Sequence, residues 1–177
     1  KLWTRSEAEA EELNQGAHSY SSTSDIEEAL NGADLVLWAV PSQKMRQNVI
    51  QVKNYLENSM LLVSAAKGLE VNSGKRMSQV LAEEIAFSLR ERICVLSGPN
   101  LAGEITQGLP AASVIAAQDI ALAERARELM ESPKFVLSTS DDVIGVELGG
   151  ALKNIIALGA GMIDGLSLGD NAKGAFI

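Results

Sequence analysis

Short runs of apolar, often β-branched residues alternate along the chain with longer stretches in which apolar residues recur at the spacing of a helix face. The short runs predict strands, and the longer stretches predict helices packed on one side. We expect strands at Leu2–Thr4, Leu35–Val40, Leu61–Ala65, Ile93–Ser97, Ser113–Ala116 and Phe135–Leu137, with a weaker one at Ala17–Tyr20. We expect helices at Glu7–Asn14, Asp25–Leu30, Gln43–Leu56, Arg76–Arg90, Leu101–Gln107 and Ile120–Glu131. This alternation predicts an α/β fold with a mostly parallel sheet covered by helices.

The alternation ends after Ser140, where a long Gly- and Ala-rich helical segment begins. We therefore predict a domain boundary there, with one domain at residues 1–140 and the start of a second, helical domain at 141–177. The apolar segment Val143–Ile163 is long enough to be considered as a membrane span. It contains Glu147 and Lys153, and each charge at bilayer depth costs on the order of 2.5 to 3.5 kcal/mol. We expect a buried helix and no membrane span.

Composition and charge narrow the range of partners. Fifteen Lys and Arg against 23 Asp and Glu give a net charge of −8, which makes nucleic acid an unexpected partner because phosphate binding needs a basic face. The single cysteine, Cys94, lies in an apolar run and indicates a reducing, cytoplasmic setting. With one cysteine and one histidine, His18, neither a zinc site nor a histidine-based catalytic pair is expected, and His18 is assigned to the solvated surface.

Three distinctive loops follow predicted strands. They contain Val40-Pro41-Ser42, Ala66-Lys67-Gly68-Leu69 and Ser97-Gly98-Pro99-Asn100, the last leading into a helix that begins near Ala102. Ligands of parallel sheets bind outside the carboxyl ends of the strands, and exposed backbone N–H groups with one ammonium suit an anionic ligand. Alternatively, Gly and Pro only make turns here, and Lys67 is an ordinary solvated loop lysine.

Lys153 interrupts a helix face of small residues. Steps of four connect it to Gly145, Gly149, Ala157, Gly161 and Gly165. Small residues let another element or a ligand approach the backbone, and a buried ammonium has the lowered pKa that proton transfer near neutral pH requires. The alternative is a tightly packed helix pair from which Lys153 extends into solvent. The neighbouring Asn154 can donate or accept a hydrogen bond.

Arg5 stands at the end of the first predicted strand. In nucleotide-binding sheets an acidic residue at this position holds a ribose hydroxyl, whereas an arginine attracts a 2′-phosphate. Arg5 therefore favours a cofactor with a 2′-phosphate, although Glu7 weakens the preference and a solvated surface arginine is the alternative.

Several motifs together resemble a known family. They are Val40-Pro41-Ser42, Lys67-Gly68-Leu69-Glu70, Leu96-Ser97-Gly98-Pro99, Gly108-Leu109-Pro110-Ala111, Val146-Glu147-Leu148-Gly149-Gly150-Ala151-Leu152-Lys153-Asn154, Asp164-Gly165-Leu166 and Gly169-Asp170-Asn171-Ala172-Lys173. The chain resembles NAD(P)-dependent glycerol-3-phosphate dehydrogenases, most closely the bacterial type, along essentially its whole length. The segment around Lys153 is highly specific, whereas the Val-Pro-Ser turn is shared with many related dehydrogenases.

The resemblance implies a Rossmann-like nucleotide-binding sheet and the reversible reduction of dihydroxyacetone phosphate to sn-glycerol 3-phosphate for glycerophospholipid synthesis. It implies a small phosphorylated substrate, NADPH or NADH as cofactor, no metal and, as an open expectation, a homodimer. By the same resemblance Lys153 is the catalytic acid and base. The substrate-binding positions are Lys67, Gly98, Asn100, Lys153 and Asn154, and the cofactor-binding positions are Arg5, Pro41, Lys67 and Ala102.

The chain also departs from the family pattern. The Gly-rich loop with its strand is expected before Lys1, the rest of the helical domain after Ile177, and Asn100 stands where serine is commoner. We therefore expect the 177-residue chain by itself to be inactive. Two alternatives stay open: another β-hydroxyacid or ketopantoate-type reductase, and a truncated, non-catalytic interaction module that pairs through an unfinished sheet edge.

Overall fold

The computed structural model describes residues 1–16 and 19–177; His18 and the start of the strand expected at Ala17–Tyr20 lie outside the described residues. The main sheet has five strands in the order β3-β4-β5-β6-β7. Their bounds are Leu35–Trp38, Leu61–Ser64, Ile93–Ser97, Ala111–Ala117 and Phe135–Ser140. The strands β3, β4 and β5 are parallel, β6 is antiparallel to β5, and β7 is parallel to β6. The α/β, mostly parallel, Rossmann-like architecture is confirmed.

A second, two-stranded parallel sheet precedes the main one. It pairs β1 (Leu2–Trp3) with β2 (Ser22–Thr23), and a cavity of about 270 Å³ lies between β1 and β3. The strand β2 was not expected from the sequence, since it is polar and only two residues long. The side chain of Asn14 holds it in place by accepting a hydrogen bond from Ser22 N and donating one to Ser22 O.

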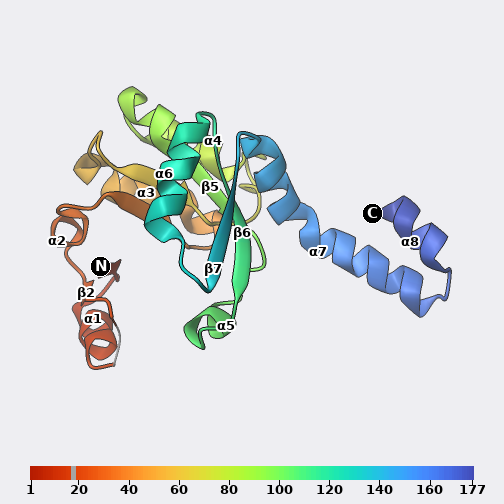
Figure 1. Ribbon diagram of the computed structural model, residues 1–177. Helices are drawn as coiled ribbons and strands as arrows, with labels where there is room; N and C mark the ends of the chain where they lie inside the picture. The colour runs from red at the N-terminus through yellow and green to blue at the C-terminus, as the bar shows by residue number, and fades with distance from the viewer. Residues whose placement is uncertain (17–18) are drawn as a thin grey trace.

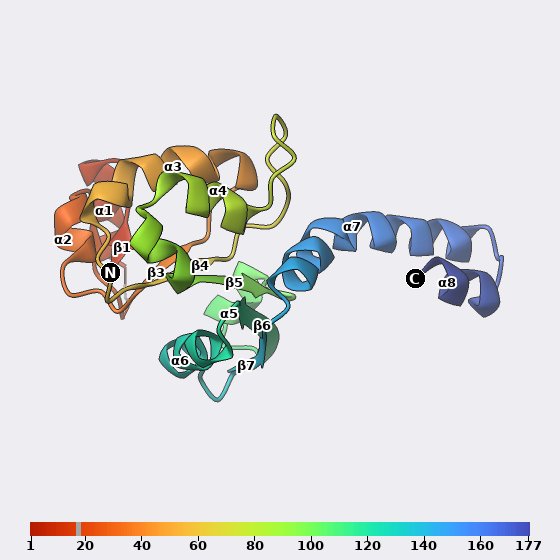
Figure 2. The same cartoon turned by 90° about the horizontal axis from the view of Figure 1, so that it is seen from above.

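The helices cover both faces of the main sheet. Their bounds are α1 Glu7–Asn14, α2 Ile26–Leu30, α3 Met45–Val52, α4 Met77–Glu84, α5 Ala102–Thr106, α6 Ile120–Met130, α7 Val143–Gly165 and α8 Asp170–Phe176. In Figure 2, α3 and α4 lie on one face of the sheet and α6 on the other. The pleat of β4 separates the two cores: Leu62 faces the α3 and α4 side, while Leu61 and Val63 face the α6 side.

Two expected helices are shorter in the structure. The helix expected at Gln43–Leu56 is α3 with a 3₁₀ turn at each end, Ser42–Lys44 and Lys53–Tyr55. The helix expected at Arg76–Arg90 ends at Glu84, because Ile85 is extended (φ −91°, ψ 164°) and inserts its side chain into the core at 5% exposure. A 3₁₀ segment, Phe87–Arg92, then leads into β5.

The helix α7 runs away from the sheet, and α8 folds back beside its far end (Figure 1). Only its beginning reaches the sheet, where it contacts β5 and β6. No residue of α7 is buried, so the expectation of a buried helix is wrong for this chain. By length and composition alone, α7 is apolar enough to cross a membrane.

Candidate functional site

Three loops meet at one edge of the main sheet. Because β3, β4 and β5 are parallel neighbours, the turn at Pro41, the loop at Lys67 and the loop at Gly98 follow their carboxyl ends side by side. This juxtaposition was predicted from the sequence. It is the position at which open parallel sheets bind ligands.

Lys67 is the lysine that the structure encloses at this edge. Its ammonium donates a hydrogen bond to the carbonyl oxygen of Gly98, which also accepts one from the backbone N–H of Asn100 at 3.0 Å. Burial lowers the pKa of Lys67, and the positive charge of Lys153 lowers it further. Gly150, three positions before Lys153 on the helix Val143–Gly165, lies against the stem of Lys67, because a Cβ on Gly150 would be 3.5 Å from Lys67 Cγ. The fold thus brings the helix of Lys153 to Lys67, although 86 positions (153 − 67) separate the two lysines in the sequence.

The loop that carries Lys67 is tied down by side chains from the α3 region. Gln43 Nε2 donates to Leu69 O at 2.7 Å, and Gln43 Oε1 accepts from Val71 N at 3.0 Å. The guanidinium of Arg46 contacts both carboxylate oxygens of Glu70 at 2.8 Å each. The loop geometry, and with it the place of Lys67, is set by these four hydrogen bonds.

The pair formed by Arg46 and Glu70 predicts a pH dependence. Hydrogen bonds from Arg46, and then from Ser73, lower the pKa of Glu70 from its ordinary value of 4.5 to about 2. A carboxyl group whose pKa is lower in the folded state stabilises the fold above its unfolded pKa and loses that contribution as pH falls through its folded pKa. We expect stability to fall between pH 4.5 and about 2, and the Glu70→Gln variant to lose less stability across that window.

Urea unfolding at several pH values between 6 and 2 measures this difference. The variant Glu124→Gln, which changes an exposed glutamate of α6, is the matched control and should follow the original chain. If the free energy of unfolding fell equally with decreasing pH in Glu70→Gln and in the original chain, the prediction would be contradicted.

A cleft of about 330 Å³ separates the Gly98 loop from the first turns of α7. One wall comes from β5, its loop and β6, and the other from α7. The lining residues are Ser97, Gly98, Pro99, Val114, Gly145, Val146, Gly149, Gly150 and Lys153. The predicted small-residue face therefore meets the cleft at Gly145, Gly149 and Lys153. The walls of the cleft are mostly apolar, and Lys153 is the one charged residue among the described residues that line it.

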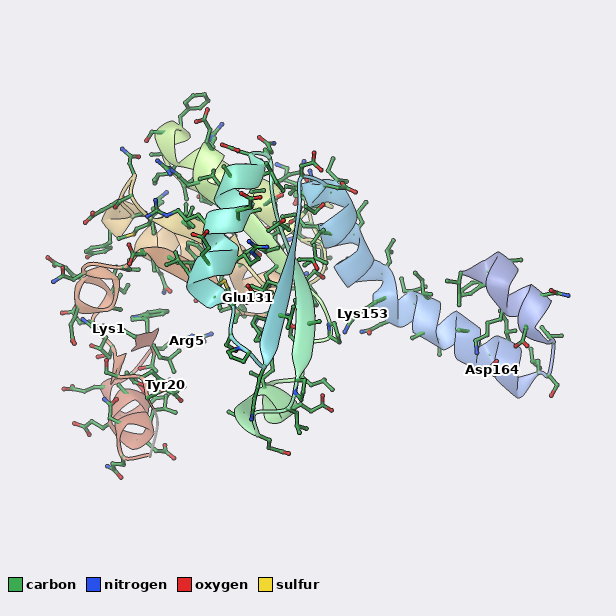
Figure 3. The ribbon with its side chains drawn as sticks, in the orientation of Figure 1. Lys1, Arg5, Tyr20, Glu131, Lys153 and Asp164 are labelled. Atoms are coloured by element: carbon green, nitrogen blue, oxygen red, sulfur yellow. The ribbon has the colours of Figure 1, made fainter. Side chains whose placement is uncertain are left out.

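Lys153 itself is exposed, so the prediction that it is buried is wrong for this chain. The physical reason is that α7 packs against the sheet only through its beginning and has left it by this position. Figure 3 shows Lys153 on α7 beside the sheet.

Gly98 is required by a close approach of two strands. A Cβ at this position would lie 2.8 Å from both Cα and Cβ of Ser113 on β6. The hydroxyl of Ser113 in turn donates to Oδ1 of Asn100 at 2.5 Å. Gly98, Asn100 and Ser113 thus form one packed unit beside Lys67.

The remaining predicted site residues lie outside the cleft. Asn154 is exposed and is not among the described residues that line it. Ala102 is exposed at the start of α5. Arg5 is exposed two positions after the end of β1, and Figure 3 shows it well apart from Lys153. Within residues 1–16 and 19–177, no group of three or more His, Cys, Asp or Glu could hold a metal ion.

Sequence reasoning did not assign a role to Glu147. Its carboxylate contacts Arg76 and Ser78 at the start of α4. The signal available in the sequence was a carboxylate inside an otherwise apolar helix. Its partners, some 70 positions earlier, could not be inferred from spacing.

Two family models match most of the chain. Residues 1–123 match the model described as NAD-dependent glycerol-3-phosphate dehydrogenase N-terminus, and residues 142–177 match the model for the C-terminus of the same enzymes.

Individual relatives and solved structures point to the same family as these two models. Over 155 residues, 88% of this chain, the sequence is 57% identical to a glycerol-3-phosphate dehydrogenase (NAD(P)+) of Dehalococcoides mccartyi, of which the match covers 43%. Over 188 residues it is 41% identical to the enzyme of the same name from Pelotomaculum thermopropionicum, covering 99% of this chain and 54% of that one. The crystal structure of glycerol-3-phosphate dehydrogenase from Coxiella burnetii superposes with a TM-score of 0.76 at 29% identity, covering 99% of this chain and 56% of that one. The chain thus spans about half the length of these proteins.

Proposed function

The chain belongs to the NAD-dependent glycerol-3-phosphate dehydrogenase family, and from this membership we propose that it interconverts dihydroxyacetone phosphate and sn-glycerol 3-phosphate with NAD(P)H as hydride donor. The product would serve glycerophospholipid synthesis. The observation that carries the proposal is that two lysines adjoin the Gly98 loop: Lys67 donates to the Gly98 carbonyl oxygen, and Lys153 lines the cleft beside that loop. Two cations at the carboxyl edge of a parallel sheet suit a small phosphorylated ketone.

Residues at this edge, together with Arg5 beside the separate two-stranded sheet, suit the binding of a nicotinamide dinucleotide. Arg5 offers an exposed guanidinium after β1, Pro41 opens the turn after β3, Lys67 follows β4, and Ala102 begins α5 beyond β5. We propose that these four residues contact the cofactor, with Arg5 favouring the 2′-phosphate of NADPH. When bound, the nicotinamide supplies the hydride.

The side chains of the site transfer a proton and stabilise the negative charge that develops on the substrate. As a carbonyl carbon is reduced, negative charge develops on its oxygen, and a positioned acid lowers the barrier by giving that oxygen a proton. We assign this proton transfer to Nζ of Lys153, which lines the cleft. Lys67 supplies fixed positive charge, Gly98 and Asn100 bind the substrate, and Asn154 orients it.

Further proposals concern the setting of the site. We propose that residues 1–140 form the nucleotide-binding domain and 141–177 the start of the helical substrate domain, which the start of α7 at Val143 supports. We propose that α7 packs against protein and does not span a membrane, since Glu147 within it is bound by α4.

A homodimer is supported by exposed apolar side chains on α7. A cytoplasmic location is supported by Cys94, a buried free thiol whose pKa burial raises to about 12.

The experiment follows oxidation of NADPH after addition of dihydroxyacetone phosphate. It compares the 177-residue chain with the longest open reading frame that contains it, and repeats each assay with NADH and with a branched 2-keto acid. We expect turnover with dihydroxyacetone phosphate in the longer protein, faster with NADPH than with NADH. Turnover with the branched keto acid alone would favour a ketopantoate-type reductase, and turnover with neither would favour a non-catalytic module.

A further inference from the structure

The carboxylate of Glu147 is bound by three donors from the beginning of α4. Nη1 of Arg76 lies 2.5 Å from Oε2, Ser78 Oγ donates to Oε2 at 2.7 Å, and Ser78 N donates to Oε1 at 2.8 Å. The Glu147 side chain is 8% exposed and that of Arg76 18%. Carboxylates this enclosed are found where they are paired and hydrogen-bonded. We call Glu147, Arg76 and Ser78 together the Glu147 clamp.

The clamp also completes the N-terminus of α4. Ser78 N belongs to the first turn of that helix, whose N–H groups have no acceptor within the helix itself. Glu147 provides the acceptor from a different element, and a negative charge is favoured at a helix N-terminus. The contact therefore fixes the position of Glu147 on α7 relative to the N-terminal end of α4.

Besides the clamp, the beginning of α7 contacts β5 and β6 and borders two hollows. The 330 Å³ cleft lies along its Lys153 side, and a second cavity of about 350 Å³ opens beside Arg76, Ser78, Val143 and Ile144. A tight approach occurs at Gly150, where a Cβ would come within 3.5 Å of Lys67 Cγ and would also meet Ser97 Oγ. The clamp and the Gly150 contact hold the helix between the two hollows.

Lys153 follows Glu147 by six positions (153 − 147), or roughly one and two thirds turns of the same helix. A hydrogen-bonded helix transmits a shift or rotation at Glu147 to Lys153 as a rigid body. Gly150, between them, packs against the stem of Lys67. A change at the clamp thus alters the placement of both lysines.

We propose that the Glu147 clamp is a positioning device that fixes where α7 places Lys153 in the cleft relative to Lys67, whose stem lies against Gly150 of the same helix. Glu147 on α7 and Arg76 at the N-terminus of α4 are positioning residues, since they contact each other and act on the site through α7. The inference deepens the proposed function and rests on it for the roles of the two lysines. The geometry of the clamp does not depend on those roles.

The test measures how strongly Lys153 acts on Lys67, without measuring turnover. The pKa of Lys67 is followed by NMR after carbon-13 methylation of the lysines, with the Lys67 signal assigned from Lys67→Arg. Four proteins are compared: the original, Lys153→Met, Glu147→Gln and the double variant. In the original, removing the charge of Lys153 should raise the Lys67 pKa; in the Glu147→Gln background this response should be lost. An equal response in both backgrounds would overturn the proposal.

A second pair of variants changes Arg76, the member of the clamp at the N-terminus of α4. This pair tests the positioning role if Glu147→Gln does not fold. Arg76→Gln should also abolish the response of Lys67 to Lys153→Met, whereas Arg76→Lys, which keeps a cation, should restore it. Asp164→Asn is the control, because it breaks the exposed ion pair with Lys173 at the far end of α7 and should leave the response unchanged. An unchanged response in Arg76→Gln would refute a positioning role even if the protein were less stable.

Because no substrate is used, failure of this test is distinct from failure of the dehydrogenase assay.

Discussion

Replacement of Lys153 by methionine is expected to lower kcat for dihydroxyacetone phosphate by about two to four orders of magnitude, the range typical of a lost general acid. Methionine keeps an unbranched apolar stem and removes the ammonium that lines the cleft. Binding of NADPH should change little, because the proposed cofactor contacts are Arg5, Pro41, Lys67 and Ala102.

The measurement is steady-state turnover of the longest open reading frame that contains the chain, with cofactor affinity from fluorescence of bound NADPH. Lys173→Met is the control, since Lys173 pairs with Asp164 on α8 and α7 far from the cleft. Lys67→Met should raise KM as well as lower kcat, because Lys67 is assigned a binding role. A kcat for Lys153→Met within about tenfold of the original would remove Lys153 from proton transfer.

Replacement of Gly98 by alanine is expected to destabilise the fold by about 1 to 3 kcal/mol, the usual cost of overpacking. The added Cβ would lie 2.8 Å from Ser113 Cα, and a backbone atom cannot rotate away as a side-chain end can. Displacement of Ser113 would also disturb its hydrogen bond to Asn100. We therefore expect weaker substrate binding in addition to the loss of stability.

Denaturant unfolding measures the first effect and KM for dihydroxyacetone phosphate the second. Gly103→Ala is a matched control, because a Cβ there meets nothing within 4 Å and alanine favours the helical conformation of α5. It should leave stability unchanged or slightly increased. A Gly98→Ala variant as stable as Gly103→Ala would contradict the close approach of β5 and β6.

The elements with strong patterns were predicted well from the sequence. The helix Glu7–Asn14 and the strand Ile93–Ser97 have the expected bounds. Both carry a local signal: an acidic first turn behind Ser6, and a continuous apolar run. The direction of β6 had no such signal, because the apolar pattern of a strand is the same in either orientation. Its antiparallel pairing with β5 is a property of the tertiary structure.

The candidate site divides in the same way. The proximity of the loops at Pro41, Lys67 and Gly98 could be predicted from the sequence, because the carboxyl ends of parallel strands lie at one edge of the sheet. The approach of the Gly98 loop to Lys153 rests on the small-residue face of α7, which was also visible in the sequence. The exposure of Lys153 could not be foreseen, since it depends on where α7 leaves the sheet. The partners of Glu147 could not be foreseen either, since they lie on another element.

The separate sheet of β1 and β2 implies a gradient of local stability. Each strand has two residues, and a parallel pair of this size gains little from its own hydrogen bonds. Its amides should therefore exchange with deuterated solvent through local opening, whereas those of β4, whose four residues are all buried, should exchange only on global unfolding. Because Arg5 lies two positions after β1, a ligand that binds Arg5 is expected to restrict the local opening of this segment, and the conformational entropy lost weakens its binding.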